Sequence, residues 1–136
     1  MRFLNTRIWM LISGALITLG GILNLSDVEK TAVDSWGNLS GRELDIASGL
    51  EQVWGFHFAG FGVSILLIAL LTNGISRARS GAVVIGLTLV SQLLTFSTLS
   101  SKGYLEEGLP IVLYVFLAIP LIAFIACVKS WNEATK

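Results

Sequence analysis

The sequence is poor in the side chains that most enzymes and metal sites use. It has one cysteine, Cys127, and one histidine, His57, among 136 residues. A single cysteine excludes an intrachain disulfide, and one cysteine with one histidine cannot complete a structural zinc site alone. Cys127 also follows the apolar run 122–126, and a thiol in such surroundings is usually unreactive. We therefore predict no metal site and no catalytic cysteine.

Charge is also scarce. Charged residues make up 13% of the chain, hydrophobic residues make up 54%, and the formal net charge is zero. Soluble domains usually carry about 25% charged residues. A soluble fold of this composition would expose large apolar patches to water, which is unfavourable. The composition favours an integral membrane protein, and the balanced charge predicts no nucleic-acid partner.

Long uncharged segments are what the sequence has instead. Four of them contain no Asp, Glu, Lys or Arg, at 8–25, 53–71, 81–99 and 109–128. At about 1.5 Å per residue, each helix would span roughly 27–30 Å, the thickness of the hydrocarbon core. Helices satisfy every backbone polar group within lipid. We predict an all-α four-transmembrane-helix bundle, with residues 1–136 forming a single membrane domain.

The connections between these segments carry charges of opposite sign. Six of the nine basic residues lie in the N-terminal segment, in 72–80 and in the C-terminal tail, whereas eight of the nine acids lie in 26–52 and 100–108. Basic residues stay on the cytoplasmic side of a membrane. The pattern predicts a multi-pass protein with both termini cytoplasmic, and the short tails suggest a bacterial plasma (inner) membrane. The first segment lacks a clear cleavage site, so we expect it to be retained.

The first extracytoplasmic connection, 26–52, is long enough to contain structure of its own. Its residues 40–43, Ser-Gly-Arg-Glu, fit a capping box at the start of a helix. Leu44, Ala47 and Leu50 then recur at helical spacing. We predict a short amphipathic helix on the outer membrane surface, leading into the second crossing. The alternative is a solvated loop in which the capping pattern arises by chance.

Small residues gather on one face of each of the first two predicted crossings. Such residues let helix backbones approach closely in lipid, where burial of apolar surface no longer drives association. We predict that these two faces pack against each other. Their members are Gly14, Thr18 and Gly21 in the first helix, and Gly55, Ala59 and Gly62 in the second.

A polar stripe runs along the third predicted crossing. It includes Thr88, Ser91, Gln92 and Thr95, and Tyr114 of the fourth crossing could hydrogen-bond to it. An unpaired amide at membrane depth would cost several kcal/mol, so Gln92 needs a partner. One interpretation is a polar cavity for a head group, a quinone ring or a small solute. The favoured one is interhelical hydrogen bonding, with hydroxyls bonded back to their own helix.

His57 is the only residue whose usual pKa lies near neutral pH. On a helical wheel it lies nearly opposite the small-residue face of its helix. We expect it to face lipid headgroups or another subunit, together with Trp54 and Phe61. A haem-ligand role would need a second axial ligand from a partner or from Met10, and we predict no cofactor.

The start of the second crossing also carries a family resemblance. Residues 50–62, Leu-Glu-Gln-Val-Trp-Gly-Phe-His-Phe-Ala-Gly-Phe-Gly, combine an acid, an aromatic–glycine pair and a glycine-rich helix. This stretch resembles the helix entry of small bacterial DoxX-like four-helix membrane proteins. The usual arginine after the acidic position is replaced here, by Gln52 or Val53. The resemblance implies a four-helix membrane fold rather than a particular activity.

Three functional hypotheses follow from these features. The leading one is a non-catalytic accessory or scaffold subunit, which contacts itself or a larger membrane complex through its helices. The second is a membrane binding or transport module for a small apolar or lipid-like ligand, held in a cavity along the Gln92 stripe. The third is a redox or enzyme subunit that uses His57 with a cofactor. All three place the protein in a lipid bilayer.

Overall fold

The chain is helical throughout the part that its computed structural model describes, residues 4–102 and 111–132. No strand occurs in these two ranges, so the all-α prediction is confirmed. The helices are α1 (Thr6–Ser26), α2 (Val28–Trp36), α3 (Arg42–Leu71), α4 (Gly74–Ser101) and α5 (Ile111–Lys129).

Three of these helices, α1, α3 and α4, are long and apolar enough to cross a membrane. Many of their large apolar side chains are exposed, and Leu23 and Leu71 are 68% and 77% exposed. Such an apolar surface is stable in contact with lipid but is unfavourable in contact with water. The chain is therefore a membrane protein. The described apolar part of α5, Leu113–Lys129, is shorter; the predicted fourth crossing begins at residues outside the described part and stays a prediction.

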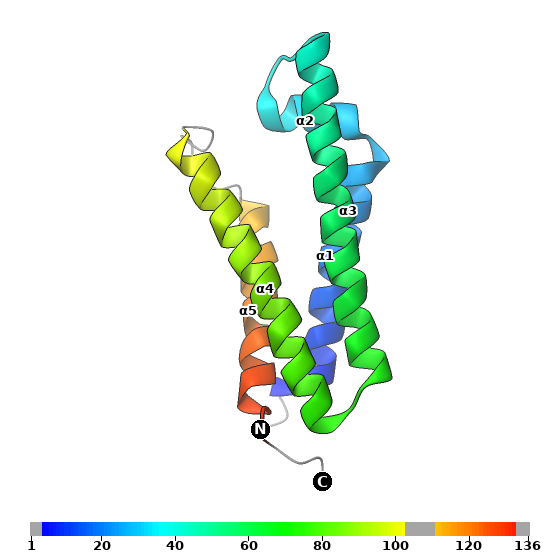
Figure 1. Cartoon of the computed structure of the whole chain (residues 1–136), viewed down its shortest axis with the longest axis vertical. Helices are drawn as coiled ribbons and strands as arrows, with labels where there is room; N and C mark the ends of the chain where they lie inside the picture. Colours follow the sequence, from blue (N-terminus) through cyan, green and yellow to red (C-terminus); the bar gives the residue numbers. More distant parts are fainter. Residues whose placement is uncertain (1–3, 103–110, 133–136) are drawn as a thin grey trace.

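The four long helices form two pairs, α1 with α3 and α4 with α5. Figure 1 shows the pairs close together where α3 turns into α4 and further apart towards the other end. Helices α1 and α5 also contact each other and so join the pairs. The buried core draws on all four helices. It includes Met10, Ile17, Ile65, Ile85 and Cys127.

The α1–α3 pair is in backbone contact through its small residues. A Cβ atom added to Gly21 would lie 2.7 Å from the carbonyl oxygen of Gly55. One added to Gly62 would lie 2.8 Å from the carbonyl oxygen of Gly14. Helices can approach this closely only where the side chain is a hydrogen atom. The structure thus brings together the two small-residue faces identified in the sequence.

The beginning of α1 and the end of α5 lie at the same end of the molecule as the α3–α4 turn (Figure 1). The Thr6 hydroxyl lies 3.2 Å from the Ala126 carbonyl oxygen and 3.0 Å from the Ser130 hydroxyl. The Arg79 guanidinium lies 5.7 Å from the centre of the Trp131 ring, within cation–π range. The Thr6 contacts join α1 to the end of α5, and the Arg79 contact joins α4 to the residues directly after α5.

The segment 26–52 forms α2 and the first part of α3. Residues 42–52 are helical, but they continue into the crossing and are not a separate element (Figure 1). The N-cap of α3 is Gly41, and it makes no side-chain capping bond. Gly41 has φ +54, a backbone conformation that glycine adopts readily. The helix therefore begins one residue after the position that the capping box predicts, and Ser40 does not cap it.

Candidate functional site

Four polar or charged side chains are buried in the described part of the chain: Ser13, Glu51, Thr88 and Gln92. Buried polar groups in a membrane protein are costly, and they are common at functional positions. Among them, Glu51 carries a formal charge and Gln92 carries a large amide, so these two side chains most need hydrogen-bond partners. A third candidate is the surface around His57.

Glu51 is 3% exposed and binds groups from two other helices. The indole nitrogen of Trp36, at the end of α2, donates to Oε1 at 2.8 Å. The Asn24 amide of α1 donates to Oε2 at 3.1 Å and to the backbone carbonyl of Glu51 at 2.6 Å. Both side-chain partners are neutral donors, and each hydrogen bond to a charged group contributes about 1.5–3 kcal/mol. We call Asn24, Trp36 and Glu51 the Glu51 clasp.

Local turns bring Trp36 to this position. Asp27 caps α2 by accepting a hydrogen bond from the backbone amide of Lys30 at 3.1 Å. Gly37 ends α2 with φ +88, and its own amide bonds the Val33 carbonyl. The chain therefore folds α2 against α3 directly after α1, and the last side chain of α2 reaches the carboxylate.

From the sequence, Glu51 was expected only as one acid of the connection 26–52 and as the acid of the DoxX-like stretch 50–62, with no buried role. A signal was nevertheless present. Glu51 lies four residues after Ala47 and four before Gly55, and all three positions are buried on one face of α3. An acid in line with small, packed residues indicates a buried carboxylate that needs hydrogen-bond donors.

The polar stripe of α4 is only partly gathered in the interior. Thr88 is 1% exposed, and its hydroxyl donates to the Val84 carbonyl of its own helix at 2.9 Å. Gln92 is 5% exposed, and its Oε1 has no hydrogen-bond partner in the described part of the chain. Thr95 is half-buried, Ser91 is exposed, and Tyr114 is 57% exposed. Ser91 and Tyr114 therefore do not line a common interior site with Gln92.

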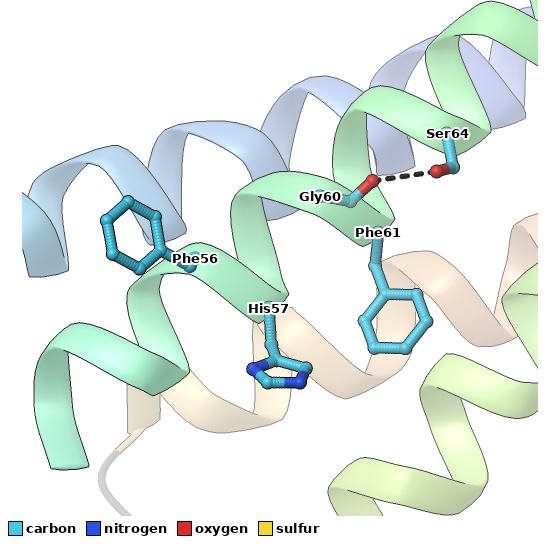
Figure 2. Close-up of a pocket in the computed structure, with 5 residues that line it drawn as sticks. All are labelled: Phe56, His57, Gly60, Phe61 and Ser64. Atoms are coloured by element: carbon cyan, nitrogen blue, oxygen red, sulfur yellow. Dashed lines mark hydrogen bonds between the residues drawn. The ribbon is translucent and has the colours of Figure 1, made fainter.

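The surface around His57 is hollowed. Phe56, His57, Gly60, Phe61 and Ser64 line a hollow of about 370 Å³ on α3. Figure 2 shows His57 and Phe61 pointing from α3 toward the side on which α4 and α5 run. His57 is exposed, whereas the Gly55, Ala59 and Gly62 face of α3 packs on α1. We call these five residues the His57 hollow.

The hydrogen-bonding groups of the His57 hollow are bonded back to α3. The Nδ1 atom of His57 lies 2.8 Å from the Val53 carbonyl oxygen. The Ser64 hydroxyl donates to the Gly60 carbonyl at 2.8 Å (Figure 2). Trp54, predicted to share this surface, is half-buried and does not line the hollow.

Residues 4–102 and 111–132 do not form a cluster of metal-binding side chains. No group of three or more His, Cys, Asp or Glu side chains there is placed to hold an ion. Cys127 is a free, buried thiol packed in the core.

Comparison with known proteins gave no match to a family model, to a curated protein sequence or to a solved structure.

Proposed function

We propose that this chain is a non-catalytic accessory or scaffold subunit that binds another membrane protein. The contact is made by residues 26–52, which we call the outer region. The proposal includes four crossings, with α5 as the fourth, and cytoplasmic termini in a bacterial inner membrane. The resemblance of residues 50–62 to DoxX-like membrane proteins supports the four crossings in this proposal.

The Glu51 clasp is the observation that carries this proposal. Residues 42–52 extend α3 beyond the uncharged segment 53–71, and α2 packs beside them. The clasp ties α1, α2 and α3 together at the point where this extension begins. If the segment between α1 and α3 served only to link two crossings, it would not need a buried carboxylate. It would also not need hydrogen-bond donors from two other helices to hold that carboxylate. A preformed surface lowers the entropic cost of binding a partner.

The charge of this outer region indicates what kind of partner would fit. Its exposed charges comprise five acids and two bases, and Glu51 is its one buried acid. Complementary charge guides association and selects partners. We propose a partner with a basic patch on the same side of the membrane. The exposed acids are Asp27, Glu29, Asp34, Glu43 and Asp45, and the exposed bases are Lys30 and Arg42.

Site-specific photocrosslinking in native membranes tests this proposal. A photoreactive residue at Asp45 is expected to form a protein adduct, because Asp45 is exposed on the outer region. The same residue at Leu87, which is 60% exposed on α4, serves as the lipid-facing control. Adding Trp36→Phe, which removes one donor of the clasp, should reduce the Asp45 adduct several-fold. A monomer that gives no adduct at Asp45 in native membranes would contradict the proposal.

A binding module is the second candidate function, and the Oε1 atom of Gln92 favours it. This buried oxygen has no partner in the described residues, so a ligand that donates a hydrogen bond would satisfy it. Mass spectrometry of the protein released from native membranes would test this by comparing wild type with Gln92→Leu. A bound small molecule lost only in the variant supports the module. Identical spectra without a ligand reject it.

A further inference from the structure

We propose that the His57 hollow binds an amphiphile whose hydroxyl group donates a hydrogen bond to Nε2 of His57. This site is separate from the outer region and from Gln92, so it does not depend on the proposed function.

The tautomer of His57 follows from its contact with Val53. A carbonyl oxygen can only accept, so the Nδ1 atom 2.8 Å away must carry the proton. In the neutral ring the other nitrogen, Nε2, then carries a lone pair. Nε2 has no partner among the described residues. The neutral imidazole therefore offers an acceptor to whatever occupies the hollow.

Ser64 offers the same kind of group. Its hydroxyl proton is donated to the Gly60 carbonyl, which leaves only oxygen lone pairs facing outward. His57 and Ser64 lie seven residues apart on α3, about 10 Å along the helix axis. The side chains of the hollow thus present two acceptors and no free donor. An occupant gains hydrogen bonds only if it brings donors, and a neutral hydroxyl does so without carrying charge into lipid.

The shape of the hollow suits a small apolar body. A Cβ atom added to Gly60 would meet nothing within 4 Å, so the floor of the hollow is bare backbone. The rings of Phe56 and Phe61 provide apolar walls. The hollow has a volume of about 370 Å³ and is open along α3, so it would cover one side of an occupant.

The depth of His57 in the membrane favours an amphiphile over a fully apolar molecule. His57 lies four residues into the uncharged segment 53–71, about 6 Å below its outer boundary. A hydroxyl at this depth stays near the headgroups, while its apolar body reaches along α3 toward Ser64. This is the arrangement that an amphiphile adopts in a bilayer.

A second copy of the chain would fit this surface poorly. Copies inserted with the same orientation would meet across a two-fold axis, with the same patch on both sides. Two hollows would then face each other, and acceptor would face acceptor at His57. Such a contact would leave a void and two unsatisfied nitrogens.

Binding of a matched pair of probes tests the proposal on the full chain in lipid nanodiscs. The probes are 4-hexylphenol and its methyl ether, which share an apolar body but differ in the donor. Saturation-transfer NMR, corrected with empty nanodiscs, would report their affinities. We expect the phenol to bind about 3- to 10-fold more tightly than the ether, the value of one neutral hydrogen bond.

Three variants locate the effect. His57→Phe keeps a ring without an acceptor and should abolish the difference between the probes, and His57→Gln should restore part of it. Gly60→Leu fills the hollow and should weaken both probes, whereas Val63→Leu, at an exposed position outside it, should weaken neither. Equal affinity of both probes for wild type would overturn the proposal. So would phenol binding unaffected by Gly60→Leu, or a disulfide-linked dimer from Gly60→Cys in a Cys127→Ala background.

Discussion

At the scale of single residues, the buried carboxylate of Glu51 gives the sharpest prediction. Trp36→Phe keeps an aromatic ring but removes the donor to Oε1. We expect a loss of about 1.5–3 kcal/mol in the free energy of unfolding, because a hydrogen bond to a charged, buried group is lost. The matched control is Trp54→Phe, since the Trp54 indole has no hydrogen-bond partner in the described residues. Equal stability of the two variants in detergent would show that the clasp contributes little.

Gln92 leads to the opposite expectation. Its Oε1 is buried without a partner, so the folded protein already bears the cost of desolvating that atom. In ligand-free lipid, Gln92→Leu should therefore leave stability unchanged or raise it by about 1 kcal/mol, as measured by reversible unfolding. Thr88→Val is the comparison, since the Thr88 hydroxyl is bonded to Val84. A clear loss of stability in Gln92→Leu would mean that its oxygen has a partner.

At the scale of helices, the α1–α3 contact depends on two backbones that cannot move apart without losing their packing. In Gly21→Ala the new methyl group would lie 2.7 Å from the carbonyl oxygen of Gly55. We expect about 1–3 kcal/mol of destabilisation from this overpacking. Gly49→Ala, also in a helix but with nothing within 4 Å of the new methyl, should gain about 0.5–1 kcal/mol. If the two alanine variants show the same melting temperature in detergent, the close contact is absent.

The helices α1, α3 and α4 followed from the sequence, because uncharged length decides which segments can span lipid, but α2 was not predicted. The predicted segment 53–71 ends where α3 ends, and the small residues of 8–25 and 53–71 mark the faces that meet. The hydrogen-bond partners of the buried polar side chains were harder to predict. Trp36 and Glu51 lie on different helices and meet only after Gly37 reverses the chain, and acids are rarely buried without a cation.

At the scale of the whole molecule, the divergence of the two helix pairs could not be read from the sequence. Helix association in lipid depends on local packing rather than on removal of apolar surface from a solvent. The sequence identifies faces that can touch, but the angle between the pairs depends on bulky contacts such as Phe116 of α5 against Gly20 of α1. The sequence placed His57 and Phe61 together on one face of α3, but it could not show that this face is hollowed or that it faces the diverging pair (Figures 1 and 2).

Orientation in the membrane is the last property at this scale, and the distribution of charge predicts it. The acidic outer region lies at the beginning of α3, whereas Arg77 and Arg79 lie near the beginning of α4, beyond the other end of α3. The two groups must therefore occupy opposite sides of a bilayer that these helices cross. In a Cys127→Ala background, Asp45→Cys should react with a membrane-impermeant maleimide in intact cells. Ser80→Cys should react only after the membrane is opened. Both positions are exposed, so burial would not prevent labelling. Labelling of both in intact cells would refute this threading, and labelling of Ser80→Cys alone would reverse it. With reversed threading, the acids of the outer region would face the cytoplasm, and the partner that we propose would have to be sought on that side.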